Sequence, residues 1–443
     1  ALRLGVASLY TVGLYTLGCK VSQYETEAIA EAFEKKGFRI VPFEEVADVY
    51  VINTCTVTAE SDRKCRQIIR RATGKKENAL VMVVGCYAQT SSDEILKIPG
   101  VSYVSGTNGK LCLPDRAVAL LSRAERTGHL CETASLEGAS FEPMCITRAP
   151  RTRAYVKIED GCECRCTYCA IPDARGNVRS KRPEDVLAEI EGLVRGGTRE
   201  VVLTGIETAS YGADLDGFRL IDLLEMLDGK SSVERIRLGS LTPEMMREET
   251  VSRLSHLKKL VPHFHLSMQS GSDSVLRGMK RRYNAKMAAE ALARLREAIP
   301  DVQFTTDIMV GFPGETDEAF DETFAFCQAA RFLDMHVFAY SKRKNTPAAR
   351  MADQVAEPIK KQRSAALLAL RESLRKDILA DLVKKGEFLS VLFETEENGS
   401  FVGHSDAFVP VRVETKEDLH GQLRLVKPLS VVDGVLCGEL IWN

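Results

Sequence analysis

The sequence predicts an α/β protein built from three parts. These are an N-terminal doubly wound parallel sheet, a central partial (β/α)6 barrel of the TIM type and a small C-terminal antiparallel β-barrel. Two observations predict this order. Apolar strand segments alternate with amphipathic helical segments over residues 10–110, and again at longer spacing over residues 152–345, as βαβ units do. Beyond residue 386, short strand segments follow one another with no helix between them.

The N-terminal part begins with three apolar segments that predict parallel strands at 10–18, 48–54 and 79–85. A helix at 22–37, capped by Ser22 and ended by Gly37, and a basic helix at 59–76 lie between them. Residues 130–150 lack a clear period and contain two prolines. We therefore expect an N-terminal domain over 10–130, a linker over 131–148 and a central domain over 149–378.

The central part contains six strand segments, at 153–159, 200–205, 235–240, 264–269, 304–311 and 335–341, with helical segments between them. In parallel α/β folds the chemistry lies at the carboxyl ends of the strands. A long basic helical pattern covers 356–385. Four strand segments, at 387–395, 407–414, 422–429 and 436–442, then predict the small barrel of a C-terminal domain over 379–443.

The composition excludes several classes of protein. Lys and Arg total 60 and Asp and Glu total 62, so a basic surface has to be local. Thirteen cysteines in 443 residues are too few for a disulfide scaffold. The first residues resemble no signal peptide, and no apolar run reaches the roughly 18 residues that span a bilayer. We expect a cytoplasmic protein with reduced thiols and no membrane contact, in which clustered cysteines bind metal.

The segment GCECRCTYCAIP contains the strongest local motif. Cys162, Cys166 and Cys169 have the spacing C-x3-C-x2-C, and three thiolates this close on a loop can hold one iron–sulfur cluster with an iron left open. Cys164 lies inside the motif and leaves C-x-C-x4-C and C-x-C-x2-C as alternative triplets. A zinc knuckle is the other alternative, although the next cysteine, Cys327, lies in a distant helical pattern.

Three further cysteines, Cys19, Cys55 and Cys86, each follow a predicted strand of the N-terminal sheet. Carboxyl ends of parallel strands lie along one edge of a sheet, so we expect these thiols to converge on a second metal site. A helix follows each of them, and we expect its N-terminus to lower the thiol pKa. The alternative is three buried core cysteines. We expect the remaining cysteines to be structural: Cys65, Cys112, Cys131, Cys145, Cys327 and Cys437.

The cysteine loop after the first barrel strand resembles that of the radical S-adenosylmethionine (SAM) superfamily. Tyr168 stands where that family has an aromatic residue, LTGIETASYG resembles its second-strand segment and TDIMVGFPGET its fifth. With the N-terminal three-cysteine domain and the C-terminal barrel, the chain resembles the methylthiotransferases. YTLGCKVSQYETEAIAEAF resembles the branch that acts on N6-threonylcarbamoyladenosine in tRNA. Ser22, in place of the family's usual Asn, and Cys164 depart from the family pattern.

This resemblance implies a transferase that adds a methylthio group to C2 of N6-threonylcarbamoyladenosine beside the anticodon. It implies two [4Fe-4S] clusters, one on Cys162, Cys166 and Cys169, the other on Cys19, Cys55 and Cys86, and SAM as the source of both a 5′-deoxyadenosyl radical and the methyl group. Beside the cluster, the expected SAM contacts are Tyr168, Gly205, Glu207, Ser240 and Gln269. Related alternatives are the same reaction on isopentenyladenosine tRNA or on a ribosomal protein. An alternative of another class is a non-enzymatic RNA-binding protein stapled by metal.

Basic residues are grouped in ways that suggest an RNA partner, the tRNA anticodon stem-loop. The C-terminal barrel resembles the TRAM RNA-binding domain, and its Phe401 and Phe408 are candidates for stacking on bases. The sequence specifies neither the electron donor nor the oligomeric state. The basic groups expected to contact phosphate are Arg63, Lys64, Arg66, Arg70 and Arg71; Arg148, Arg151 and Arg153; Arg175, Arg179, Lys181 and Arg182; and Lys280, Arg281 and Arg282.

Overall fold

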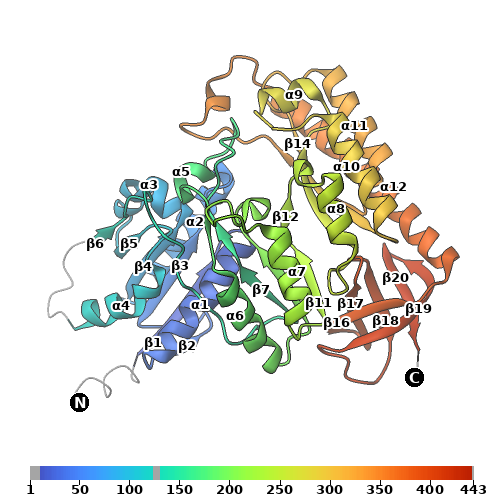
Figure 1. Cartoon of the computed structure of the whole chain (residues 1–443). Coiled ribbons are helices and arrows are strands. Elements are labelled where there is room, and N and C mark those ends of the chain that lie inside the picture. Colours follow the sequence, from blue (N-terminus) through green and yellow to red (C-terminus); the bar gives the residue numbers. More distant parts are fainter. Residues whose placement is uncertain (1–9, 123–129, 442–443) are drawn as a thin grey trace.

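The computed structural model of the chain describes residues 10–122 and 130–441. It shows two parallel α/β units followed by a long helix and a closed β-barrel (Figure 1). The first residues, to which the signal-peptide prediction refers, and Trp442 of the last predicted strand lie outside the described residues. No helix within the described ranges is long and apolar enough to cross a membrane.

The N-terminal unit is a six-stranded parallel sheet in the order β2-β1-β3-β4-β5-β6. Helices α2 and α3 pack on one face and α1 and α4 on the other, so the sheet is doubly wound as predicted. The elements are β1 Thr11–Thr16, α1 Lys20–Lys35, β2 Arg39–Val41, β3 Val49–Thr54, α2 Ala59–Thr73, β4 Leu80–Gly85, α3 Cys86–Leu96, β5 Val101–Ser105, α4 Leu113–Leu121 and β6 Leu130–Glu132.

The predicted start of the first helix is wrong by two residues. Helix α1 begins at Lys20 with Cys19 as its N-cap, and Ser22 is buried in the first turn. Gly18 explains the early start, because its φ of +127° turns the chain directly from β1 into the helix. A Cβ on Gly18 would lie 2.8 Å from the Ser22 hydroxyl oxygen. Ser22 therefore packs inside this turn and does not cap the helix.

The central unit is an arc of parallel strands. β7 Arg153–Lys157 pairs with β10 Glu200–Thr204 and β10 with β11 Arg235–Leu238. After a break at Gly239, β12 Ser240–Leu241 continues the arc to β13 His263–Gln269, β14 Gln303–Val310 and β15 Asp334–Ala339. In the described pairings, β7 and β15 form no bond with each other. The predicted six strand positions and the partial barrel are thus confirmed.

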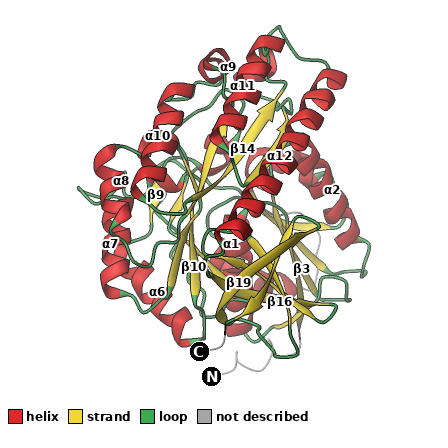
Figure 2. Ribbon diagram, turned by 90° about the vertical axis from the view of Figure 1, so that its right-hand side faces the viewer, coloured by secondary structure: helices red, strands yellow, loops and turns green. Residues whose placement is uncertain are grey.

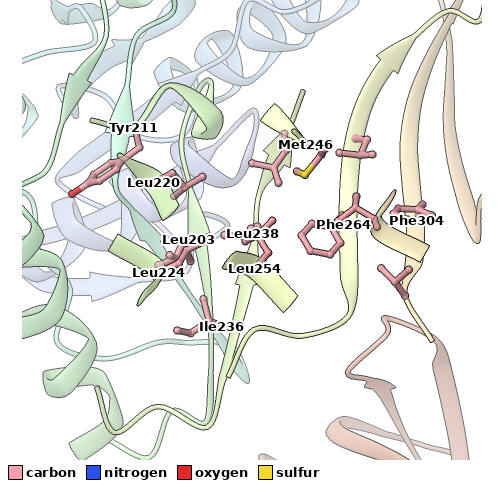
Figure 3. Close-up of a cluster of buried hydrophobic side chains, with 14 of the residues drawn as sticks. Leu203, Tyr211, Leu220, Leu224, Ile236, Leu238, Met246, Leu254, Phe264 and Phe304 are labelled. Carbon is pink, nitrogen blue, oxygen red and sulfur yellow. The ribbon is translucent and has the colours of Figure 1, made fainter. Parts of the chain in front are cut away.

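Helices cover the outside of this arc, with α6, α7, α8 and α10 forming one layer (Figure 2). Leu224 on α7 and Leu254 on α8 lie beside the strand residues Leu203 and Leu238 in the main core (Figure 3). The remaining elements are the short antiparallel pair β8 Glu159–Asp160 and β9 Arg179–Ser180, and α5 Ile171–Arg175, α6 Pro183–Arg195, α7 Leu220–Lys230, α8 Glu248–Ser255, α9 Asp273–Gly278, α10 Ala285–Ala298 and α11 Asp317–Ala330.

The long helix α12, Glu357–Lys385, leads into a closed barrel in the order β16-β17-β18-β20-β19. Its strands are β16 Leu389–Glu397, β17 Ser400–Ser405, β18 Pro410–Glu414, β19 Leu423–Val432 and β20 Val435–Leu440. β17 was not predicted, because Gly403, His404 and Ser405 interrupt the alternation of apolar and polar residues that is typical of a strand. The expectation of a purely antiparallel barrel is also wrong, because β18 and β20 pair in parallel to close it.

Candidate active site

The cysteine loop follows β7 and β8 and leads into α5, so it lies at the carboxyl end of the first barrel strand. Gly161 begins the loop with a φ of +93°, and a Cβ there would overlap the Asn177 carbonyl oxygen, so only glycine fits. Thr167 holds the loop in place: its N–H donates to the Met279 carbonyl oxygen at 3.2 Å and its hydroxyl to the Gly278 carbonyl oxygen at 2.8 Å. The predicted placement of this loop is confirmed.

Two sulfur atoms of the loop accept hydrogen bonds from N–H groups. Arg281 donates from Nη1 to Cys166 Sγ at 3.3 Å, and the Ile171 N–H donates to Cys169 Sγ at 3.4 Å. N–H donors of this kind favour a thiolate, the form that binds metal, but burial outweighs the Ile171 N–H and raises the pKa of Cys169 to about 12. Sequence reasoning placed Arg281 on an RNA surface and missed this contact, since a run of basic residues does not reveal which member turns inward.

Cys164 lies next to Cys162. Its N–H is 3.5 Å from Cys162 Sγ and its own Sγ is 3.9 Å from Glu207 Oε2. The ligand atoms of Cys162, Cys164 and Glu207 all lie within 4.8 Å of one another, whereas the structure does not draw Cys162, Cys166 and Cys169 together in this way among the described residues. Its hydrogen bond with Cys162 lowers the pKa of Cys164 to about 6. Which triplet binds iron therefore remains a prediction.

The second set of cysteines follows the carboxyl ends of the neighbouring strands β1, β3 and β4. A Cβ on Gly18 would lie 3.2 Å from Cys55 Cβ, and the charges of Cys19 and Cys86 both act on Cys55. Cys19 is exposed, while Cys55 and Cys86 are buried. Burial raises the pKa of Cys55 to about 11 and also raises that of Cys86. The expected lowering is wrong for these two thiols, because desolvation outweighs the helix N-termini.

Cys65 and Arg175 hold this second set in position. The thiol of Cys65 donates to the Cys55 carbonyl oxygen at 3.3 Å and accepts from the Cys55 N–H at 3.4 Å. Arg175 is fully buried and donates from Nε to Cys86 Sγ at 3.2 Å. Its Nη1 donates to Glu25 on α1 at 2.6 Å and to Asp160 on β8 at 3.2 Å. Arg175 thus links the second set to the barrel.

A cavity of about 330 Å³ lies beside the cysteine loop, where the central unit meets the segment after Cys55. Val57 and Thr58, just beyond Cys55, line one side, and Tyr168, Cys169 and Gln269 line another. The segment after β15 fastens the two units beside this cavity. Arg343 pairs with Asp62 at 2.7 Å and donates to the Thr56 hydroxyl at 2.5 Å. A molecule in this cavity would therefore contact Cys169 of the cysteine loop and the residues that follow Cys55.

Of the predicted SAM contacts, Tyr168 and Gln269 line the cavity. Gly205 and Glu207 lie beyond the end of β10, where burial raises the pKa of Glu207 to about 8. Ser240 is exposed at the start of β12. These placements bring Glu207 close to the cysteine loop, and among the described residues Ser240 forms no hydrogen bond with that loop.

Unpaired polar atoms show that the site fits a polar cofactor. Gln269 has a φ of +63°, and its Oε1 is buried without a hydrogen-bond partner among the described residues, as are Glu159 Oε1 and Thr208 Oγ1. Buried polar groups normally have partners, and a strained residue of this kind often marks a ligand site. Thiolates on one loop are the ligands of an iron–sulfur cluster. The residues present therefore fit an iron–sulfur cluster and SAM.

A polar group inside the barrel was missed by the sequence analysis. Asp307 lies 3.1 Å from both His265 Nε2 and His336 Nδ1, and it also lines the cavity. Burial raises the pKa of Asp307, but hydrogen bonds from the two imidazoles outweigh burial and lower this pKa overall.

The predicted RNA surface needs correction. Arg175, Arg179 and Lys181 are buried in ion pairs, as is most of Arg153, and cannot contact phosphate. Phe401 belongs to the core of the small barrel. Phe408 stacks between His263 and His404, with ring centroids 4.7 and 4.8 Å away. Neither ring is free to stack on a base. The exposed members are Arg63, Lys64, Arg70, Arg71, Arg148, Arg151, Arg182, Lys280 and Arg282.

The fold and the cysteine loop define a radical SAM enzyme. Residues 156–327 match the model of the radical SAM superfamily, and residues 11–106 match that of the uncharacterized protein family UPF0004. The solved structure of the radical S-adenosylmethionine methyltransferase TsrM from Kitasatospora setae superposes with a TM-score of 0.56 at 18% identity, over 77% of each chain. That likeness shows a shared fold.

The names of curated relatives specify the reaction more closely. The threonylcarbamoyladenosine tRNA methylthiotransferase MtaB of Bacillus subtilis is 42% identical over 95% of this chain and 94% of its own. MtaB of Thermotoga maritima is 38% identical over 80% of each chain. The tRNA-2-methylthio-N(6)-dimethylallyladenosine synthase of Carboxydothermus hydrogenoformans is 33% identical over 96% of this chain and 98% of its own. The chain belongs to the threonylcarbamoyladenosine tRNA methylthiotransferase family. The non-enzymatic alternative is thereby excluded.

Proposed function

We propose that this chain adds a methylthio group to C2 of N6-threonylcarbamoyladenosine beside the anticodon of tRNA. The observation that carries the proposal is the cavity bounded by Cys169 on one side and by Val57 and Thr58, just beyond Cys55, on the other. The identity to relatives named for threonylcarbamoyladenosine, 42% and 38%, exceeds the 33% and 36% to two relatives named for dimethylallyladenosine. This difference favours the first substrate over isopentenyladenosine.

The residues have separate tasks in this proposal. Cys162, Cys166 and Cys169 would hold one [4Fe-4S] cluster, and Cys19, Cys55 and Cys86 a second. When bound, the clusters and SAM supply the one-electron chemistry, the sulfur and the methyl group that side chains lack. Arg281 and the Ile171 N–H hold the sulfurs of Cys166 and Cys169 through hydrogen bonds.

The residues that line the cavity bind the cofactor and limit the access of water in this proposal. Gln269, with its unpaired Oε1, would bind the polar part of SAM. Apolar wall residues, among them Met309 and Phe338, limit the access of water to the reacting atoms. The C-terminal barrel, which resembles a TRAM domain, would hold the RNA by charge through its exposed basic residues.

Nucleoside mass spectrometry tests the proposal. A strain that lacks the gene should lose the 2-methylthio derivative of threonylcarbamoyladenosine and keep that of isopentenyladenosine. The anaerobically reconstituted enzyme should contain roughly eight irons per chain. Cys166→Ala should abolish SAM cleavage, while Cys55→Ala should retain cleavage and lose methylthio transfer. About four irons per chain in the wild type would contradict the proposed second cluster. An unchanged nucleoside spectrum in the strain that lacks the gene would contradict the proposed substrate.

A further inference from the structure

Three side chains of metal-ligating type converge inside the central barrel, apart from the two cysteine sets. They are His265 on β13, Asp307 on β14 and His336 on β15. One ligand atom of each lies within 4.8 Å of the ligand atoms of the other two. Asp307 is 3.1 Å from His265 Nε2 through Oδ2 and 3.1 Å from His336 Nδ1 through Oδ1. Two imidazole nitrogens and one carboxylate oxygen are a ligand set that binds divalent first-row transition metals.

The register of the strands brings these side chains together. Asp307 lies opposite His336 where β14 pairs with β15, and His265 lies opposite Thr305, two residues before Asp307. Residues two apart on a strand share a face, so the three side chains lie on the same face of the sheet. Phe338, two residues beyond His336, lines the cavity, as Asp307 itself does. The three ligands therefore lie on the inner face of the barrel, beside the cavity.

The spacing of the ligand atoms suits a metal ion. Zinc bonds of about 2.0–2.1 Å at tetrahedral angles place neighbouring ligand atoms about 3.4 Å apart. The two distances of 3.1 Å from Asp307 are close to this value, so small rotations of the side chains suffice to bind an ion. Three protein ligands leave at least one coordination position open to water or to an oxygen atom of a molecule in the cavity.

Neighbouring hydroxyl groups orient two of the ligands. The Thr305 hydroxyl lies 2.9 Å from His265 Nδ1, and the Ser267 hydroxyl donates to Asp307 Oδ2 at 3.4 Å. When Nδ1 donates its proton to Thr305, Nε2 keeps the lone pair that a metal needs. Thr305 can in turn donate to His263 Nε2, which is 3.0 Å away. Hydrogen bonds of this kind accompany histidine and carboxylate ligands in metal sites.

An ion can reach this group from solvent. The side chain of His336 is 70% exposed, whereas those of Asp307 and His265 are 26% and 12% exposed. The group thus has one outer ligand that can capture an ion and two inner ligands that can hold it. It contains no cysteine, so the ion would be bound separately from the iron–sulfur clusters.

We propose that His265, Asp307 and His336 bind one divalent first-row transition-metal ion in addition to the iron–sulfur clusters. The inference goes beyond the proposed function, because it depends neither on the nucleoside that is modified nor on which cysteines hold the clusters. Through its open coordination position, the ion would polarise an oxygen atom of a molecule in the cavity.

Zinc uptake by the reconstituted holoenzyme tests the inference, since the clusters then occupy the cysteines that bind them. The protein is incubated with a small excess of Zn²⁺ and desalted, and zinc and iron are counted by mass spectrometry. We expect the wild type to retain about one zinc per chain more than His336→Ala, with equal iron in both. Asp307→Asn should lose the same zinc.

Two further variants make this comparison specific. Thr305→Val removes the hydroxyl that orients His265 and should weaken zinc binding by about 10- to 100-fold, as measured by competition with a fluorescent chelator. His256→Ala removes an exposed histidine at the end of α8 and is the matched control. It should retain as much zinc as the wild type.

X-ray absorption at the zinc edge identifies the ligands in the wild type. We expect nitrogen and oxygen neighbours at about 2.0–2.1 Å, and not the sulfur neighbours at about 2.3 Å that cysteines would give. Equal zinc in the wild type, His336→Ala and Asp307→Asn would show that the three side chains only form hydrogen bonds with one another, and overturns the inference. A zinc shell made of sulfur alone overturns it as well.

Discussion

Removing the charge of Glu25 should loosen the junction between the N-terminal sheet and the barrel. Glu25 is fully buried on α1 and accepts from Arg175 at 2.6 Å and from Lys157 at 2.9 Å, and it also pairs with Lys110. Burial raises the pKa of Glu25, but these three cations outweigh it and hold the pKa well below its usual value. The carboxylate is therefore ionised, and it is the central anion of the network.

Glu25→Gln leaves the buried cations with Asp160 as their remaining carboxylate. Lys110 loses its one ion pair within the described residues. Breaking a buried ion pair from one side costs about 3–5 kcal/mol, because the other charge stays desolvated and unpaired. We expect the opening free energy of α1, measured by native-state hydrogen exchange, to fall by that amount. Glu34→Gln on the same helix is the control and should cost less than about 1 kcal/mol, since its partner Arg148 is exposed.

A second substitution separates charge from packing. Adding Lys110→Met to Glu25→Gln removes the stranded cation, so part of the lost stability should return. The reasoning is refuted if Glu25→Gln lowers the opening free energy of α1 by less than about 1 kcal/mol, or if the double variant is less stable than the single one.

Three further results are expected. Burial raises the pKa of Glu200, but Arg237 and Arg153 lower it to about 2, below its ordinary 4.5. The ionised Glu200 therefore contributes fully to stability above pH 4.5, and this contribution is lost as the pH falls from 4.5 to 2. In urea unfolding, the wild-type free energy of unfolding should fall by about 3 kcal/mol over this pH range because of Glu200, and Glu200→Gln should abolish that part of the fall. Phe408→Ala should cost about 2 kcal/mol and speed proteolysis between the two barrels, since Phe408 packs between two imidazoles. Arg175→Met should change the electron paramagnetic resonance signal of the proposed second cluster, because Cys86 Sγ loses its donor.

Each of these results has a clear contrary outcome. An acid-unfolding curve for Glu200→Gln that coincides with the wild type would contradict the assigned pKa. Unchanged proteolysis in Phe408→Ala would show that its stacking does not hold the barrels together. A wild-type resonance spectrum in Arg175→Met, at full iron content, would show that the Arg175 contact does not affect the cluster.

Much of the fold follows from local patterns. The strands that precede Cys55 and Cys86 are buried throughout and mostly apolar, as buried parallel strands are, and the structure places them where the patterns predict. Short or polar elements escaped prediction. β17 is one example, because Gly403 and His404 contribute little apolar signal and pairing with β16 and β18 decides its conformation. Long-range pairing of this kind is not encoded in a local period.

The sequence by itself determined the cysteine loop and the strand-end positions of the second cysteine set, because these depend on spacing and on the shared direction of parallel strands. The class of chemistry followed from the resemblance of the loop to that of the radical SAM superfamily. The tertiary structure alone decided which charged residues turn inward. Arg175 and Arg281 look like surface cations in the sequence, yet they reach Cys86 and Cys166. The physical reason is that burial and ion pairing depend on side chains that folding brings together from distant segments. The sequence around a charged residue does not specify which side chains these are.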